Sequence, residues 1–232
     1  MRSPSVGDPQ ESYTPVPQMP PTRSRATEPV NEGALGLSPH SGWAVLVAVG
    51  GTSAQPQLLM RVRIEMADQD LQGSKQPYHE VEGLPIAEAE RRLMGYRESA
   101  GAMAYAALRP VVESLRRTGY EPTAAGILES SGRKVTSLES ILASHALIHT
   151  ADGNHFREAL AQACARCNLP VRRVRGRDLL EQAARTLGKR PQQLQASIQA
   201  LGRSCGRPWD ADHKCAALLA WLLLAGKTKT LG

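Results

Sequence analysis

Two short apolar runs separated by a tight polar turn constrain the fold of this chain more than any other segment. The first run is Ala34–Leu37, the turn reads Ser38-Pro39-His40-Ser41-Gly42, and the second run extends from Trp43 to Val49. Proline and glycine in a short polar stretch favour a turn, and apolar runs of this length on both sides are typical of paired strands. The segment therefore predicts a β-hairpin whose turn carries Ser38 and His40.

A third strand is predicted over residues 57–66. Its apolar residues fall at every second position, at Leu58, Met60, Val62 and Ile64. This period of two is typical of a strand with one buried face. Because short turns join it to the hairpin, the three strands predict an antiparallel meander.

The following residues alternate between helical and strand patterns. A polar loop over 68–83 precedes a long amphipathic helix over 85–118, in which Pro110 favours a kink or a split. A strand over 124–128 ends at Glu129. Helices over 138–150 and 155–167 are separated by a predicted break at Asp152-Gly153. A strand over 170–174 and helices over 177–187, 191–201 and 208–225 complete the pattern.

Helices that alternate with strands after a meander predict an α/β fold. We expect a mixed five-stranded sheet, with an antiparallel meander followed by parallel strands, and helices on both faces. Residues 1–33 contain seven of the sixteen prolines and show no apolar period. They predict a disordered, Pro-rich tail, and residues 34–228 predict one domain.

The net charge and the cysteines bear on the expected partner and the expected cellular compartment. A net charge of +6 permits an anionic partner without requiring one. The chain shows no secretory signal, and the apolar run over 216–226 is too short to span a bilayer, so we expect a buried helix there and no membrane. Four cysteines without an extracellular signature predict reduced thiols and a cytoplasmic location.

The order of elements and three motifs resemble the ribonuclease H-like superfamily, and in particular RuvC-type Holliday-junction resolvases. The first strand of that family ends in Asp-Pro-Gly, followed by Gly-Trp or Gly-Tyr, where this chain has Ser38-Pro39-His40-Ser41-Gly42-Trp43. Glu129 matches the catalytic glutamate at the end of the family's fourth strand. Asp210 and Asp212 match the aspartates that begin its last helix. The resemblance covers roughly residues 34–225 and implies a ribonuclease H-like fold.

The resemblance also implies two divalent metals, Mg²⁺ or Mn²⁺, held between carboxylates, and a metal-dependent nuclease (phosphodiesterase) activity. The candidate catalytic residues are then Glu129, Asp210 and Asp212, with Ser38 and His40 beside them. Ser38 offers a hydroxyl where the family has an aspartate. The family's last aspartate falls near His213-Lys214, where a lysine would repel a metal ion. Two of the four ligand positions therefore depart from the family.

Arginines and lysines form the candidate nucleic-acid contacts. The densest basic run contains Arg172, Arg173 and Arg175, to which we add Arg133, Lys134 and Lys214. Arginine clusters favour phosphate recognition. The alternative is an ordinary solvated strand end.

A second hypothesis for a metal site rests on residue spacing alone and is independent of the family resemblance. His145, His149 and Asp152 are spaced by four and three residues, which places them on one face of a helix that continues that far. Two histidines and a carboxylate suit zinc or iron. The alternatives are histidines that pack on the core or contact nucleic acid, and zinc is less favoured than Mg²⁺ or Mn²⁺. His40 and the Tyr78-His79-Glu80 segment are further candidates for the same crevice, as a general base or as turn structure.

These patterns lead to one function hypothesis and two alternatives. The first is a diverged RuvC-like protein that binds or processes structured nucleic acid. The alternatives are a catalytically inactive interaction module and a phosphate- or nucleotide-binding protein. Nucleic acid is the expected partner, and a homodimer is left open.

Overall fold

The computed structural model describes residues 31–130 and 137–228. Residues 1–30 of the tail predicted over 1–33, and the candidates Arg133 and Lys134, lie outside the described residues. The strands are β1 (Asn31–His40), β2 (Trp43–Gly51), β3 (Pro56–Glu65), β4 (Tyr120–Glu129) and β5 (Val171–Arg175). The helices are α1 (Pro77–Glu80), α2 (Ile86–Arg117), α3 (Leu138–Leu142), α4 (His145–Arg166), α5 (Gly176–Leu187), α6 (Pro191–Leu201), the short 3-10 helix η1 (Gly202–Ser204) and α7 (Ala211–Thr228).

One mixed sheet organises the chain, in the order β3-β2-β1-β4-β5. The β1–β2 and β2–β3 pairs are antiparallel, whereas β4 pairs in parallel with both β1 and β5. The predicted meander followed by parallel strands is confirmed. With helices on both faces, this arrangement is ribonuclease H-like.

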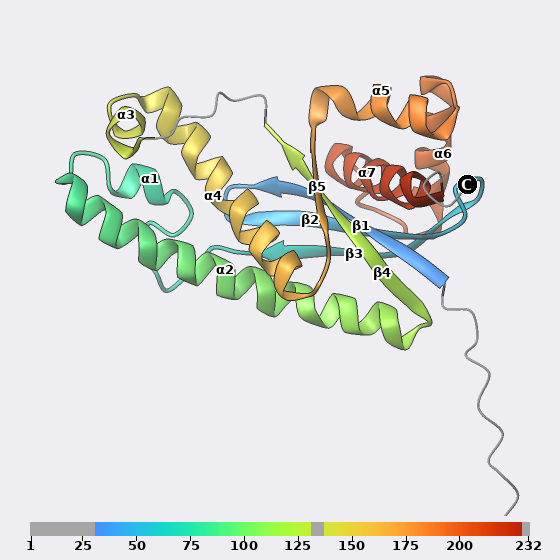
Figure 1. Ribbon diagram of the computed structural model, residues 1–232, viewed down its shortest axis with the longest axis horizontal. Helices are drawn as coiled ribbons and strands as arrows, with labels where there is room; N and C mark the ends of the chain where they lie inside the picture. Colours follow the sequence, from blue (N-terminus) through green and yellow to red (C-terminus); the bar gives the residue numbers. More distant parts are fainter. Residues whose placement is uncertain (1–30, 131–136, 229–232) are drawn as a thin grey trace, which may run out of the picture.

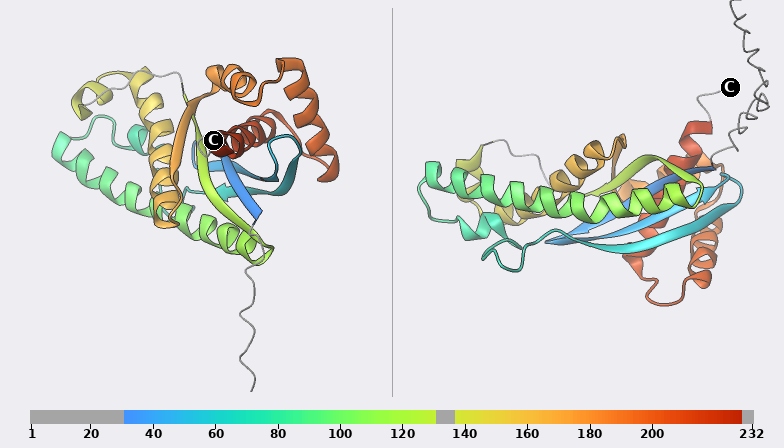
Figure 2. Two further views of the ribbon diagram at one scale, coloured as in Figure 1. Left: turned by 45° about the vertical axis from the view of Figure 1, so that its right-hand side comes forward. Right: turned by 90° about the horizontal axis from the view of Figure 1, so that it is seen from below.

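The helices divide between the two faces of the sheet (Figures 1 and 2). The apolar cluster on one face joins the strands to α2 and α4, and the cluster on the other joins them to α5, α6 and α7. Residues alternate between these clusters along β1 and β4, as the period of two of a strand requires. Leu37 and Ile127 belong to the α2–α4 side, and Leu128 belongs to the α7 side.

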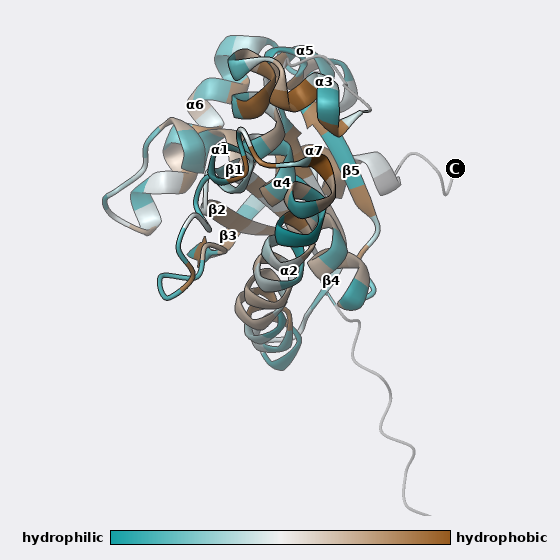
Figure 3. Cartoon of the chain, turned by 90° about the vertical axis from the view of Figure 1, so that its left-hand side faces the viewer, coloured by the Kyte–Doolittle hydropathy of each residue, from teal (hydrophilic) through white to brown (hydrophobic). Residues whose placement is uncertain are grey.

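Helix α7 lies very close to the sheet because β1 and β4 present glycines to it. A Cβ at Gly36 would stand 1.9 Å from the Ala216 carbonyl oxygen, and one at Gly126 would stand 2.5 Å from Leu219. Every residue from Ala216 to Ala225 is buried, which confirms the predicted buried helix. Figure 3 shows the apolar colour on α7 and the polar colour on β5. Among the described helices, none is long and apolar enough to cross a membrane.

Several boundaries differ from the sequence prediction, and β4 begins at Tyr120, four residues earlier than predicted. The helix does not break at Asp152-Gly153, because α4 runs without interruption through both residues, and the break falls instead at Ala143-Ser144, between α3 and α4. Ser137 caps α3, since its side chain accepts a hydrogen bond from the Ser140 amide. Pro110 does not split α2, which is one helix of 32 residues. Strand β1 begins at Asn31, three residues earlier than predicted.

The amino-terminal halves of α2 and α4 carry a third apolar cluster of their own. Tyr78 and Val81 from the α1 segment pack there against Leu93 and Tyr96 of α2 and Ile148 of α4. The predicted polar loop over 68–83 therefore contains a short helix, α1, held against α4. This packing brings His79 to the surface of α4.

Candidate functional site

The first candidate site is the crevice where β1 ends beside the start of α7, with Ser38, His40 and Asp212 as its central residues. Ser38 is buried, and its hydroxyl donates a hydrogen bond of 2.8 Å to Oδ1 of Asp212. Nε2 of His40 lies 2.9 Å from the same oxygen. The structure thus brings together three of the predicted catalytic residues.

The contact between His40 and Asp212 is close but lacks the geometry of a hydrogen bond. Although Nε2 is close to the carboxylate, it has no hydrogen-bond partner of good geometry among the described residues. When the imidazole is protonated, the two groups attract by charge at this distance. Oδ1 of Asp212 therefore contacts both the Ser38 hydroxyl and Nε2 of His40.

This arrangement differs from a Ser-His-Asp hydrolase. In such an enzyme the histidine lies between serine and aspartate and removes the serine proton. Here Asp212 lies between Ser38 and His40, and the Ser38 hydroxyl already donates to the carboxylate. The geometry does not prepare Ser38 as a nucleophile.

Trp43 separates His40 from Arg63 in a stack at the edge of the crevice. The His40 and Trp43 rings are parallel within 10°, with centroids 4.1 Å apart. The Arg63 guanidinium carbon lies 3.8 Å from the Trp43 ring centroid. At these distances both groups cannot occupy one face of the indole, so Trp43 lies between them. Cation–π attraction then holds the Arg63 guanidinium in place.

A surface recess of about 460 Å³ adjoins this stack. Ser41, Trp43, Arg63 and Lys75 line it, together with Glu65, whose carboxylate accepts a hydrogen bond from Nε of Arg63. The two terminal nitrogens of Arg63 have no hydrogen-bond partner within the described ranges. The recess therefore carries two cationic side chains and one carboxylate, and that carboxylate is paired with Arg63.

Glu129 points to the other face of the sheet. Leu37 lies opposite Ile127 in the parallel pair of β1 and β4, so Leu128 is level with Ser38. Because side chains alternate, Leu128 shares the α7 face with Ser38, and Glu129 turns toward α4. There its Oε1 accepts a hydrogen bond of 2.8 Å from Arg173.

Arg173 connects β5 to α4 through two carboxylates, Glu129 and Glu158, both within 2.9 Å of its guanidinium. Burial opposes the charge on Arg173, but these hydrogen bonds outweigh it and raise its pKa. Arg172 donates to Gln182 of α5, and Arg175 is exposed at the end of β5. Of the predicted basic run, Arg173 is thus already paired within the fold.

Asp210 and Lys214 do not join Asp212 at the crevice. Asp210 caps α7, because its Oδ1 accepts hydrogen bonds from the His213 amide and from Nδ1 of His213. The bond to the His213 side chain lowers the pKa of Asp210. Lys214 lines a cavity of about 440 Å³ between α7 and helices α5 and α6.

These residues do not fit the two-metal site that the family resemblance implies. Such a site needs several carboxylates that converge on one point. Asp212 is the carboxylate at Ser38, Glu129 lies on the opposite face, and Asp210 is a helix cap. In residues 31–130 and 137–228, the three-residue group with converging ligand atoms is elsewhere, at His79, His145 and His149.

The second predicted metal group is rearranged in the structure. His145 and His149 are neighbours on the exposed face of α4, as the spacing predicts, and their Nε2 atoms are 3.2 Å apart. Asp152 is not the third member. Its side chain is buried, its Oδ1 accepts a hydrogen bond of 2.7 Å from the Tyr78 amide, and its Oδ2 lies 2.5 Å from Nδ1 of His79. Burial raises the pKa of Asp152, whereas the bonds from Tyr78 and His79 oppose the increase.

His79 therefore belongs with His145 and His149, and not with His40 at the crevice. Its ring centroid lies 5.3 Å from that of His145 and 4.4 Å from that of His149. Residue spacing could not reveal this, because His79 comes from a different segment. The packing of α1 on α4 creates the group.

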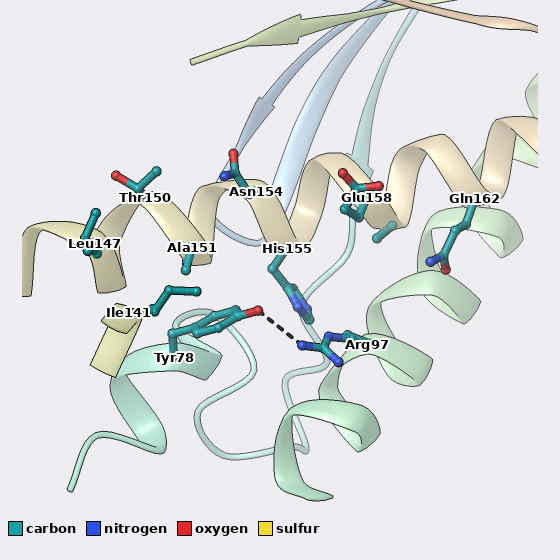
Figure 4. A pocket seen from close by; sticks show the side chains of 11 residues that line it. Tyr78, Arg97, Ile141, Leu147, Thr150, Ala151, Asn154, His155, Glu158 and Gln162 are labelled. Atoms are coloured by element: carbon teal, nitrogen blue, oxygen red, sulfur yellow. Dashed lines mark hydrogen bonds between the residues drawn. The ribbon is translucent and has the colours of Figure 1, made fainter. Parts of the chain in front are cut away.

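A separate cavity of about 320 Å³ lies on another side of α4. Figure 4 shows His155 of α4 and Tyr78 of α1 directed toward Arg97 of α2, which donates a hydrogen bond of 3.3 Å to the Tyr78 hydroxyl. His155 is buried, and neither ring nitrogen has a well-aligned hydrogen-bond partner in the described chain, although the Tyr96 backbone favours protonation slightly. Burial, and then the charge of Arg97, lower the pKa of His155 to about 4.

No protein-family model matches the chain, and no curated protein matches it. A Thermus thermophilus RuvC structure is similar over 85% of this chain and 97% of its own, with 13% identity and a TM-score of 0.49. T. thermophilus RuvC in complex with a Holliday junction substrate matches 86% of this chain and 97% of its own, with 12% identity and a TM-score of 0.49. An Aquifex aeolicus member of the Ppx/GppA family matches 68% of this chain and 40% of its own, with 8% identity and a TM-score of 0.33.

The fold is ribonuclease H-like. The strand order and connections of this chain carry that assignment.

Proposed function

We propose that this protein binds the phosphate backbone of structured nucleic acid at the crevice and does not cleave it there by two-metal chemistry. The observation that carries the proposal is the stack of His40, Trp43 and Arg63 beside the recess that contains Lys75. The stack fixes one guanidinium and one imidazole at the edge of the recess. Fixed guanidinium groups favour phosphate because several N–H donors meet its oxygens at once.

The charges of the crevice support binding more than cleavage. Oδ1 of Asp212 accepts the Ser38 hydroxyl and lies 2.9 Å from Nε2 of His40, so the carboxylate that would repel a phosphate is already engaged within the fold. Arg63 and Lys75 both line the recess, and the one carboxylate that lines it, Glu65, pairs with Nε of Arg63 and leaves its two terminal nitrogens without a protein partner among the described residues. The chain as a whole carries a net charge of +6, which favours association with a polyanion.

Base stacking is not part of the proposal. Both faces of Trp43 are already covered, by His40 on one side and Arg63 on the other. A single-stranded ligand that depends on stacking would need a free aromatic face. We therefore expect a preference for structured nucleic acid, which presents its phosphates in a regular array.

The test is a fluorescence anisotropy titration of labelled four-way junction, duplex and single-stranded DNA with EDTA present. We expect saturable binding to the junction that weakens with salt, because phosphate contacts release counterions. Arg63→Gln removes one such contact and should reduce the salt slope by about 1.

Arg109→Gln is the matched control, since Arg109 also pairs with a single exposed glutamate, Glu113. It lies on α2, toward the end that leads into the start of β4, away from the crevice. The control should bind like the wild type. Equal loss in Arg63→Gln and Arg109→Gln, or no binding by the wild type, would overturn the proposal.

A further inference from the structure

Three of the six histidines of this chain meet at one place on its surface. His145 and His149 are one turn apart on α4, and α1 brings His79 against them. The three rings lie edge to face, with interplanar angles of 63° to 90°. One nitrogen of each ring lies within 4.8 Å of a nitrogen of the other two. The lone pairs of three imidazoles can thus be directed toward one point.

The distance between two of these nitrogens matches the separation of two ligands on one metal ion. Zinc binds histidine nitrogen at about 2.0–2.1 Å in tetrahedral geometry, so two such ligands stand about 3.3 Å apart. Nε2 of His145 and Nε2 of His149 are 3.2 Å apart. A ring nitrogen of His79 lies within 4.8 Å of a nitrogen of each of the other two, so His79 is placed to complete a set of three.

Asp152 gives His79 the orientation that a ligand requires. The carboxylate is 3% exposed, is fixed by the Tyr78 amide, and faces Nδ1 of His79. A histidine that donates its Nδ1 proton to a carboxylate presents the Nε2 lone pair outward, and metal-binding histidines commonly have such a partner. The buried carboxylate also supplies negative charge close to the three rings.

The exposure of these rings distinguishes them from histidines that pack in a hydrophobic core. His145 and His149 are exposed, and His79 is partly exposed, so the rings do not contribute to a core. The apolar cluster that contains Tyr78, Ile148 and Ala151 lies beside them and fixes the two helices that carry the ligands. A site with rigid supports and one open side is suited to bind an ion from solution.

We propose that His79, His145 and His149 form a binding site for a divalent transition metal, preferentially zinc, with Asp152 as the positioning residue of His79. Three nitrogen ligands suit zinc and exclude magnesium, which prefers oxygen. The exposed side leaves the fourth position for water or for an oxyanion such as phosphate. This site shares no residue with the crevice proposed to bind nucleic acid.

The experiment uses the full chain after removal of metal, titrated with zinc sulfate in competition with a chromophoric chelator. We expect one zinc ion per chain. His149→Ala removes an exposed ligand and should weaken binding by at least 100-fold while far-UV circular dichroism stays unchanged. His213→Ala is the control, because it removes a histidine of α7 and should leave zinc affinity as in the wild type.

A second variant tests the role of Asp152. Asp152→Asn keeps the size of the side chain and should weaken zinc binding by about 10- to 100-fold, the usual range for such partners. Cobalt substitution gives an independent readout, since a tetrahedral site produces visible absorption that His149→Ala should abolish. The proposal is overturned if the wild type binds no zinc, or if His149→Ala binds it as tightly as His213→Ala. Neither result bears on DNA binding, which is measured with EDTA present.

Discussion

The hydroxyl of Ser38 donates a 2.8 Å hydrogen bond to the carboxylate of Asp212, a residue 174 positions further along the chain. The pair joins the end of β1 to the first turn of α7. A hard divalent cation is usually shared by at least two carboxylates, and Ser38 offers a hydroxyl to Asp212 where a second carboxylate would be needed, so this pair is not a two-carboxylate metal site.

Replacing Ser38 with aspartate tests this relationship. Ser38→Asp places a second carboxylate against Asp212 and removes the hydrogen bond, so we expect unfolding free energy to fall by about 1–3 kcal/mol at neutral pH. Two facing carboxylates attract a hard cation, and millimolar Mn²⁺ should raise the melting temperature of this variant more than that of the wild type. Ser38→Asn is the neutral control. If Ser38→Asp and Ser38→Asn are equally stable and equally insensitive to Mn²⁺, the proximity to Asp212 is wrong.

Gly36 tests the close approach of α7 to β1. A methyl group at this position would stand 1.9 Å from the Ala216 carbonyl oxygen, and helix backbone cannot move away without disturbing the whole face. Gly36→Ala should cost about 3 kcal/mol or more, measured by urea denaturation. Gly95→Ala is the control, since Gly95 lies in α2 with open space around it, and we expect a gain of about 0.5–1 kcal/mol. A Gly36→Ala protein as stable as the wild type would contradict the packing described above.

The sequence allowed much of the fold to be predicted because its strongest signals are local. Apolar runs, alternation and turn residues lie close together in the chain, and they determine the meander and the buried α7. The break at Asp152-Gly153 was predicted wrongly because the Asp152 carboxylate is satisfied by Tyr78 and His79, which belong to another segment. Tertiary packing there keeps the helix continuous.

The candidate sites were harder to predict than the fold. The contact between Ser38 and Asp212 could be anticipated, because one motif marks the end of the first strand and the other marks the start of the last helix. The direction of Glu129 depends on strand register, and a shift of one residue moves a side chain to the opposite face. The partnership of His79 with His145 and His149 depends on how α1 packs on α4, and no spacing in the sequence encodes it.

His155 makes stability depend on pH. Its pKa is about 4 in the folded chain against 6.5 for an unperturbed histidine, so the unfolded chain binds more protons between these values. Stability should therefore decrease as pH falls from 6.5 toward 4, by an amount of at most about 3 kcal/mol. The raised pKa of Asp152 acts in the opposite direction, because the folded chain then takes up that proton more readily.

The measurement is urea denaturation at pH 7 and pH 5 for the wild type and for His155→Leu. The variant removes the titrating group and keeps the position apolar, so its loss of stability between the two pH values should be smaller. An identical loss in both proteins would show that His155 does not carry this dependence.

The central claim is that the crevice binds nucleic acid without cutting it by two-metal chemistry. The most direct measurement incubates the wild type with a labelled four-way junction in Mg²⁺ or Mn²⁺ and determines both the bound fraction and the length of every strand, beside Glu129→Gln. The account predicts a bound junction with intact strands in both proteins. Strands cleaved by the wild type and left intact by Glu129→Gln, or a junction that stays unbound, would contradict it.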